Sequence, residues 1–198
     1  MTAGGPRRVK ILGIVASARK QGNCALLLKE VFQRLRGGFE TETVFLSDLE
    51  IKPCDGCHYC QKKGACRIQD DMAALGGLLQ DADAVVLCSP TYMGGLSSRM
   101  RAFMERTWPL RKGKMAGRTG SYIVTGRRKI GVAVSAMSDY LSRLGMVTVP
   151  GVLGYAFEQG AIAEDEEAME EARRLARDLE RHLRGSVRNG DEPKANGG

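Results

Sequence analysis

The segment "VKILGIVASARKQGN", residues 9–23, places an aliphatic run directly before a polar turn that contains glycine. Its β-branched and apolar residues predict a buried strand over residues 9–17. Apolar residues then recur at the i, i+3, i+4, i+7 spacing of an amphipathic helix: Leu28, Val31, Phe32 and Leu35. The chain therefore starts with a strand, a loop and a helix, which is the repeating unit of α/β folds.

The same alternation continues along the chain. Further strands are predicted over residues 40–48, 84–90, 120–126 and 146–153, and further helices around residues 72–79, 100–104, 130–144 and 164–184. The run Ala84–Pro90 is apolar almost throughout, as in a strand buried on both faces, and Pro150 places the last strand at a sheet edge. Five strand–helix units of this length predict an α/β fold with a doubly wound parallel sheet.

Length and composition favour one domain over residues 1–184, because 198 residues suit a single core. A cysteine-rich loop at residues 50–70 lies within this domain, and the polar residues 185–198 predict a disordered tail. The sequence has neither an apolar run long enough for a membrane span nor a signal-peptide pattern. We therefore predict a cytoplasmic protein, in which clustered cysteines more often bind metal or do redox work than form disulfides.

The net charge of +7, from 30 Lys and Arg against 23 Asp and Glu, favours an anionic cofactor or an acidic protein partner. Ordinary solvated surface charge is the simpler alternative. Aromatic residues are only 6% of the chain and no nucleic-acid-binding motif is present. We expect neither a membrane nor a nucleic acid as partner.

The first predicted loop, "SARKQGNC" (Ser17–Cys24), leaves the carboxyl end of a strand, where parallel sheets of this kind bind ligands. It lacks the GxGxxG and Walker patterns, but it offers a hydroxyl, two cations and the start of a helix, which suit a phosphate. Arg19 is suited to hold a phosphate with two donors, and Asn23 is a good N-cap residue. An ordinary capped turn explains this loop alone equally well.

Two more loops leave strand ends in the same way. In "SPTYMGGLSSRM" (Ser89–Met100), glycines let the backbone approach a flat ligand while Tyr92 and Met93 offer apolar faces. The loop "VTGRRKIG" (Val124–Gly131) again puts a hydroxyl and a glycine at a strand end. Together the three loops predict a pocket with a phosphate site at one end and flat apolar walls at the other, which suits FMN.

The segment "CDGCHYCQKKGAC", residues 54–66, has the spacing C-x2-C-x2-C-x5-C. Three cysteines at intervals of three suit the corners of a compact [4Fe–4S] cluster, and Gly64 lets the chain turn back so that the fourth closes it. We predict four metal ligands: Cys54, Cys57, Cys60 and Cys66. A structural zinc site and free or redox-switching thiols are the alternatives.

The residues around the cysteines say less about the kind of site than the cysteine spacing does. His58 is read as a bystander between ligands. Lys62, Lys63 and Arg67 would surround a cluster with positive charge, which raises its potential and attracts an acidic electron carrier. Cys88, inside a buried strand, is read as a small core residue.

The stretches "SARKQGN", "SPTYMGG" and "CDGCHYCQKKGACRIQDDM" together resemble the NAD(P)H-dependent FMN reductase superfamily of flavodoxin-like proteins, and more closely its iron–sulfur flavoprotein branch. The resemblance covers about residues 9–180. It implies a flavodoxin-like sheet of order 2-1-3-4-5 and a homodimer or homotetramer with FMN at subunit contacts. It also implies an FMN site drawn from three loops: Ser17, Arg19, Lys20, Gln21, Gly22, Asn23, Cys24, Pro90, Thr91, Tyr92, Met93, Gly94, Gly95, Thr125, Gly126 and Arg127.

Two positions depart from the family pattern. Cys24 stands where a Ser or Thr is usual, which weakens one hydroxyl contact to the phosphate. Arg127, Arg128 and Lys129 stand where the family often has small residues. These cations either stabilise a reduced anionic flavin, contact the phosphate of an incoming dinucleotide, or simply face solvent.

The predicted function is that of an FMN- and [4Fe–4S]-containing oxidoreductase. It would take electrons from a ferredoxin-like carrier or NAD(P)H and pass them to an acceptor such as O2 or H2O2. No catalytic acid, base or nucleophile is predicted, because the cofactors carry the chemistry. The alternatives are a clusterless NAD(P)H-dependent FMN or quinone reductase, and a zinc-stabilised binding protein of the same fold.

Overall fold

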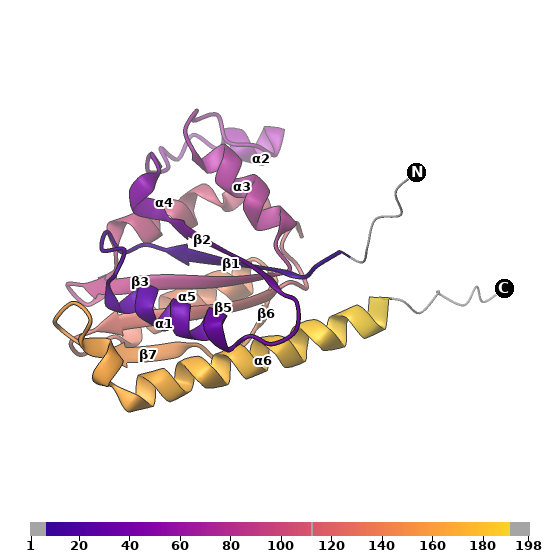
Figure 1. Ribbon diagram of the computed structural model, residues 1–198. Helices are drawn as coiled ribbons and strands as arrows, with labels where there is room; N and C mark the ends of the chain where they lie inside the picture. The colour runs from indigo at the N-terminus through magenta and orange to yellow at the C-terminus, as the bar shows by residue number, and fades with distance from the viewer. Residues whose placement is uncertain (1–6, 112, 191–198) are drawn as a thin grey trace.

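A parallel sheet of order β2-β1-β3-β5-β6 runs through the middle of the chain in the computed structural model, which describes residues 7–111 and 113–190 (Figure 1). Its strands are β1 (Lys10–Val15), β2 (Glu40–Phe45), β3 (Ala84–Tyr92), β5 (Thr119–Gly126) and β6 (Val147–Thr148). Every pair along this path is parallel. The flavodoxin-like sheet expected from the sequence is therefore confirmed.

The fifth predicted strand differs in detail, because it is divided into β6 and β7 (Val152–Tyr155), and both pair with β5. Pro150 lies at the break and has no N–H to donate to a ladder. Gly151, next to it, packs so tightly on Tyr122 that a Cβ would overlap that residue. The strand therefore lies at the sheet edge, as predicted, but in two pieces.

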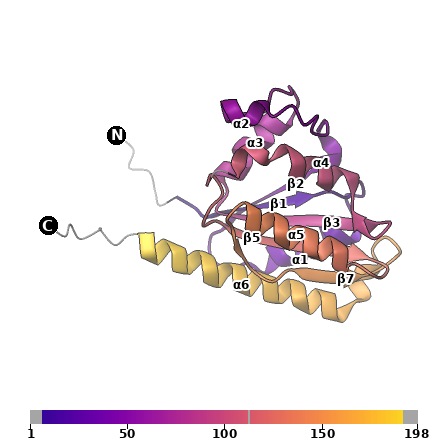
Figure 2. The same cartoon turned by 180° about the vertical axis from the view of Figure 1, so that it is seen from behind.

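Helices cover both faces of the sheet (Figures 1 and 2). Helices α1 (Asn23–Arg34) and α6 (Glu166–Gly190) pack on one face, and α3 (Met72–Asp81), α4 (Ser98–Arg106) and α5 (Gly131–Arg143) on the other. Side chains of β1 alternate between these two cores: Ile11 and Val15 face α1 and α6, and Leu12 and Ile14 face the opposite layer. This alternation is why the strand is apolar throughout.

Helix α6 begins two residues later and ends six residues later than the predicted range 164–184. Ala161–Glu164 form a short 3-10 helix, η3, before it. The extension passes through Gly185, since one glycine costs a helix only about 1 kcal/mol and does not end it. The predicted disordered tail is therefore wrong for residues 185–190, which are helical, and residues 191–198 lie outside the described part of the chain.

The cysteine segment lies between β2 and α3, where the sequence places it. Strand β2 ends at Phe45, three residues earlier than predicted, and the 3-10 helix η1 (Leu46–Asp48) follows. A five-residue helix, α2 (Tyr59–Lys63), forms within the stretch expected to be a loop. None of the helices in the described residues is both long enough and apolar enough to cross a bilayer.

One further hairpin follows β3. The two-residue strand β4 (Gly95–Leu96) turns back antiparallel onto Thr91 and Tyr92. Met93 and Gly94 between them both have positive φ, at 50° and 79°, as a two-residue hairpin turn requires. The second predicted loop is thus a tight hairpin rather than an open loop.

Candidate functional site

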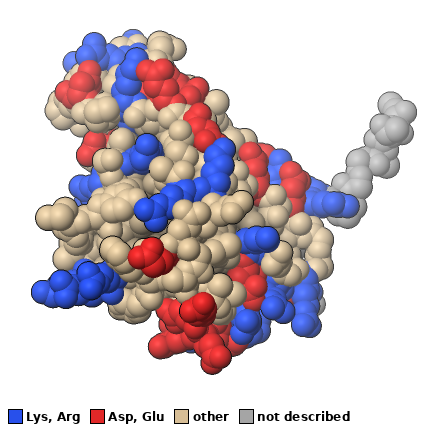
Figure 3. All heavy atoms as spheres, turned by 60° about the vertical axis from the view of Figure 1, so that its left-hand side comes forward, with Lys and Arg blue, Asp and Glu red and all other residues tan. Residues whose placement is uncertain are grey.

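A pocket of about 290 Å³ lies at the carboxyl ends of β1, β3 and β5, and we call it the edge pocket. All three predicted loops contribute to it, together with a fourth loop after β7. It is lined by Ser17, Arg19, Gly22, Asn23, Cys24, Pro90, Thr91, Tyr92, Thr125, Gly126, Arg127, Ala156, Phe157, Glu158 and Gln159. Figure 3 views the molecule from this side, where uncharged residues occupy much of the face with Lys and Arg among them.

The first loop is a tight turn built around Ser17. The Ser17 Oγ accepts a hydrogen bond from the Arg19 backbone N–H at 3.1 Å, and the Gly22 N–H donates to the Arg19 carbonyl at 3.0 Å. A Cβ at Gly22 would lie 3.0 Å from that same carbonyl, which is a tight contact, so the turn favours glycine. No described side chain caps α1, whose first backbone N–H groups are therefore available to an anion in the pocket.

Asn23 has a different role from the N-cap predicted for it, because Gly22 occupies that position. The Asn23 amide instead donates to the Glu158 carbonyl at 3.0 Å and accepts from the Gly160 N–H at 2.9 Å. Both ends of the side chain thus bind the loop after β7. The sequence predicts that this side chain caps α1. In the fold it instead joins two loops, and Gly160 lies 137 positions further along the chain.

Cys24 is buried, and its sulfur lies 3.0 Å from the Thr125 Oγ1 of the third loop. Burial raises the pKa of the Cys24 thiol to about 12, against a smaller opposing effect of the Thr125 hydrogen bond. The thiol is therefore neutral at physiological pH and does not repel an anion. Its side chain joins the first and third loops.

The second and third loops are in close contact. A Cβ added at Gly126 would overlap the Thr91 Oγ1 and lie 2.8 Å from Ile130. Arg127 extends from the third loop over the Phe157 ring, with its guanidinium carbon 5.2 Å from the ring centre. This cation–π pair forms one wall of the pocket.

Five of the sixteen residues predicted for FMN lie outside the pocket lining: Lys20, Gln21, Met93, Gly94 and Gly95. Lys20 instead pairs with Asp48 at 2.7 Å, and Met93 points fully into solvent. Arg127 lines the pocket, whereas Arg128 and Lys129 are exposed beyond it. The sequence reasoning missed the fourth loop, "GYAFEQG" (Gly154–Gly160), although it too has an aromatic residue between glycines at a strand end.

A second pocket, of about 280 Å³, lies among the cysteines, and we call it the cysteine pocket. Cys54, Cys60 and Cys66 line it, together with Gly56, His58, Gln61, Glu105, Arg106, Trp108 and Pro109. Trp108 and Pro109 belong to the 3-10 helix η2 (Trp108–Leu110) that follows α4. The His58 ring is hydrogen-bonded to the Gln61 side chain at 3.0 Å.

The four thiols of the segment lie close enough to influence one another. Burial raises the pKa of Cys60, and Cys66, Cys54 and Cys57 each raise it further. The Gly56 N–H donates to the Cys54 sulfur at 3.4 Å. A backbone N–H directed at sulfur stabilises negative charge there, as the Gly56 N–H does at Cys54.

Asp55 and Arg67 form an exposed ion pair, at 2.5 Å, beside Cys57. Hydrogen bonds from Cys57 and then from Arg67 lower the pKa of Asp55 to about 2. Lys62 and Lys63 are exposed on α2 nearby. The outer side of the cysteine segment is therefore polar and carries three cations.

A buried ion pair closes the base of the cysteine segment. The Arg106 guanidinium binds both Asp70 oxygens, at 2.5 and 2.9 Å, and both side chains are at most 1% exposed. Arg106 also donates to the carbonyls of Lys52, at 2.7 Å, and Ile68, at 3.3 Å. Burial opposes the charge of Arg106, but the Asp70 hydrogen bonds keep its pKa above the ordinary value. One arginine of α4 thus holds the chain before and after the cysteines.

The edge pocket and the cysteine pocket share no lining residue among those described. Helix α4 separates them. Its N-cap Ser97 lies at the carboxyl edge, where its Oγ donates to the Ala16 carbonyl at 3.4 Å, and Arg106 is at its other end. Nine helical residues span about 13 Å. The leaving of a strand end by the cysteine segment suggests that it reaches the same rim as the other loops, but the cysteine pocket lies at the far end of α4, away from that rim.

A single metal ion has no ready site in the described part of the chain, where no three His, Cys, Asp or Glu side chains are arranged to hold one.

Residues 9–159 match the NADPH-dependent FMN reductase family. The chain is 36% identical, over 125 residues, to an iron–sulfur flavoprotein of Methanocaldococcus jannaschii; the match covers 62% of this chain and 65% of that protein, slightly less than two thirds. It is 32% identical over 164 residues to an iron–sulfur flavoprotein of Archaeoglobus fulgidus, covering 80% and 74%. An archaeal flavodoxin structure has the same fold, with TM-score 0.57 and 13% identity over 89% of this chain and 99% of that one.

Proposed function

This chain belongs to the NADPH-dependent FMN reductase family, and from that premise we propose that it is an electron-transfer flavoprotein with two cofactors. FMN would occupy the edge pocket, and a [4Fe–4S] cluster the cysteine pocket. The observation that carries the proposal is that three of the spaced cysteines line one cavity, next to the buried Arg106–Asp70 ion pair, which we call the buried clamp. Relatives named iron–sulfur flavoproteins support it.

The edge pocket suits FMN in its polarity. The uncapped N-terminus of α1 and Arg19 supply donors for the phosphate, and the neutral Cys24 thiol does not oppose it. Pro90, Tyr92 and Gly126 would lie along the flat ring system. Bound FMN supplies the ability to exchange either one or two electrons, and the chain binds and orients it.

The cysteine pocket suits a cluster by its donor set. Cys54, Cys57, Cys60 and Cys66 would be the ligands, and the N–H that reaches the Cys54 sulfur would stabilise a thiolate. The cations Lys62, Lys63 and Arg67 on the outer side would attract an acidic, ferredoxin-like electron carrier. The surface thus favours a one-electron donor that approaches from the side of α2.

A second copy of the chain completes this proposal. Tyr92, Met93 and Phe157 are 58%, 105% and 69% exposed beside the edge pocket, which leaves apolar surface open to solvent. A homodimer or homotetramer would cover these residues and bring one subunit's flavin toward another subunit's cysteine pocket. For an acceptor such as H2O2, reduction to two water molecules takes two electrons, which two one-electron carriers supply in turn, and two protons, which come from the solvent.

The alternative function is a clusterless NAD(P)H-dependent reductase, and the family description favours it. Arg127 at the mouth of the edge pocket would then meet the dinucleotide phosphate. Rapid bleaching of the oxidised flavin by NADPH, in protein without iron, would support this alternative over ours.

Iron, acid-labile sulfide, zinc and FMN per chain, measured on protein purified without oxygen, test the proposal. We expect about four irons, four sulfides and one FMN. One FMN without iron or sulfide would contradict the cluster and favour the simple reductase. One zinc per colourless chain would contradict both and leave a zinc-stabilised binding protein.

A further inference from the structure

Arg106 has one donor that the protein around it does not use. A guanidinium carries five N–H groups. Those on the two terminal nitrogens point to Asp70, to the Lys52 carbonyl and to the Ile68 carbonyl. The fifth, on Nε, has no hydrogen-bond partner within the described residues, although the atom is fully buried.

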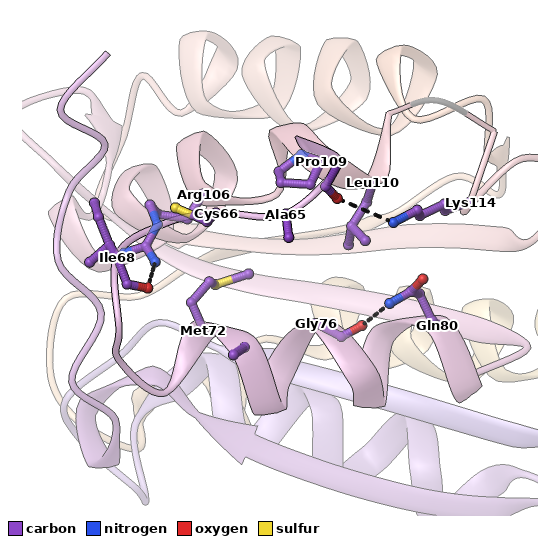
Figure 4. A pocket seen from close by; sticks show the side chains of 12 residues that line it. Ala65, Cys66, Ile68, Met72, Gly76, Gln80, Arg106, Pro109, Leu110 and Lys114 are labelled. Atoms are coloured by element: carbon purple, nitrogen blue, oxygen red, sulfur yellow. Dashed lines mark hydrogen bonds between the residues drawn. The ribbon is translucent and has the colours of Figure 1, made fainter. Parts of the chain in front are cut away.

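This unused N–H lies at the cysteine pocket. Arg106 and Cys66 both line that cavity, and both also line the neighbouring hollow of about 220 Å³ shown in Figure 4, so they form part of the wall between the two. Figure 4 shows the Cys66 sulfur beside the guanidinium. Burial lowers the pKa of Arg106, whereas the Asp70 hydrogen bonds and then the nearby Cys66 side chain raise it.

A buried N–H without an acceptor is rare in proteins, because it has lost its water without replacement. The Asp70 ion pair holds the guanidinium rigidly in place, so the Nε–H cannot turn away to find another partner. A neutral thiol is a weak acceptor, but a thiolate bound to iron is a strong one. The donor therefore fits the loaded state of the site better than the empty one.

We propose that Arg106 is a positioning residue for the cluster: its buried Nε–H donates to the Cys66 sulfur when that sulfur is an iron ligand, and this stabilises the reduced cluster. The inference rests on the proposed [4Fe–4S] site. Reduction adds one electron to the cluster, so a fixed donor on a ligand sulfur favours the reduced, more negative state. The chain thereby raises the potential of its cluster from the α4 side.

Arg106→Lys tests this, because lysine keeps a cation opposite Asp70 and removes the Nε–H. We expect iron, sulfide and FMN contents near those of the wild type. At a fixed potential the ratio of reduced to oxidised cluster should fall about tenfold, which is about 59 mV for a one-electron couple. The measurement is a redox titration followed by electron paramagnetic resonance, with resonance Raman spectra of the Fe–S(Cys) stretches in H2O and D2O.

Arg67→Lys is the matched control, since Arg67 also lies beside a cysteine of the segment but its side chain is 55% exposed. In Arg67→Lys the ratio of reduced to oxidised cluster at that fixed potential should change less than twofold. The D2O-dependent shift of the Fe–S stretch at Cys66 should persist in Arg67→Lys and disappear in Arg106→Lys. A purely structural role for Arg106 would not move that isotope shift.

If Arg106→Lys fails to fold, the double variant Arg106→Met with Asp70→Asn removes both buried charges together and serves the same test. A variant that retains its cluster with an unchanged potential and isotope shift overturns the inference and leaves the cluster itself in place. Wild-type protein without iron or sulfide, by contrast, overturns the proposed cluster and this inference with it.

Discussion

The two pockets of this chain are built in opposite ways. The edge pocket collects four loops that are far apart in the sequence, from Ser17 to Gln159, and joins them by close backbone contacts and single hydrogen bonds. The cysteine pocket takes its thiols from thirteen consecutive residues, closed by one buried ion pair. A local spacing thus provides one site and the sheet provides the other, so each should respond to its own set of mutations.

Cys60→Ala should have the largest effect and should separate the two pockets cleanly. It removes a proposed iron ligand at the centre of the cysteine segment, so we expect nearly complete loss of iron with FMN still bound. Iron and FMN per chain measure this. Lys62→Ala, on the same short helix but exposed, is the control and should retain both. Joint loss of FMN and iron in Cys60→Ala would show that the pockets are not independent.

Asp70→Ala should give the next largest effect, on stability. It leaves the Arg106 guanidinium buried without its partner, which costs about 3–5 kcal/mol in the free energy of unfolding. Urea unfolding of the purified protein measures the change. Asp55→Ala breaks an exposed pair in the same segment and should leave the unfolding midpoint nearly unchanged. Equal losses in the two variants would argue against the buried clamp.

The clamp should also respond to acid. Burial works against the Asp70 charge, but the Arg106 hydrogen bonds and those from backbone N–H groups outweigh it and lower the pKa of Asp70 below its ordinary value near 3.8. Its stabilising contribution is therefore complete above that ordinary value and is lost as the pH falls through the lower folded pKa. Unfolding free energies measured from pH 6 to pH 2 should fall less steeply in Asp70→Asn than in the wild type.

Gly126→Ala should damage the edge pocket alone. The new Cβ would overlap the Thr91 Oγ1 and push the second and third loops apart, at a cost of about 1–3 kcal/mol in stability. FMN affinity should fall while iron content stays normal. Gly131→Ala is the matched control, because no described atom lies within 4 Å of its Cβ position. Unaltered FMN binding in Gly126→Ala would place the flavin elsewhere.

Arg19→Ala should have the smallest effect of this series. Loss of one charge-assisted hydrogen bond to a phosphate is expected to weaken FMN binding about tenfold, with iron content unchanged. A fluorescence titration of FMN into the apoprotein measures the dissociation constant. Lys20→Ala is the control, since Lys20 belongs to the same loop but pairs with Asp48 outside the pocket. An equal loss in both variants would indicate a general charge effect.

The fold could be predicted well from the sequence because its signals are local. Aliphatic runs of strand length and helical spacing of apolar residues depend only on neighbours along the chain, and they gave the elements of the sheet within a few residues. Errors appeared at element ends, as in the division around Pro150 and the extension of α6 past Arg184. There, tertiary packing and not local preference decides the boundary.

The candidate site was predictable in part for the same reason. The cysteine spacing and the strand-end loops are visible as short patterns, and eleven of the sixteen predicted residues, from Ser17 to Arg127, line the edge pocket. The loop at Ala156–Gln159 was missed because it joins the pocket through Asn23, a contact between residues far apart in the sequence. Arg106 was missed likewise, since an arginine in an amphipathic helix is ordinarily exposed.

The sequence alone determined the strand–loop–helix order, the hydroxyl, cation and glycine at the first turn, and a cysteine spacing suited to several thiolates. Each of these features depends on residues that are close together along the chain. Only the tertiary structure decided that Asn23 binds the loop after β7, that Arg106 reaches Lys52, Ile68 and Asp70, and that α4 separates the two pockets. Such contacts form when distant segments are buried together, because burial requires each polar group to find a partner wherever the fold supplies one.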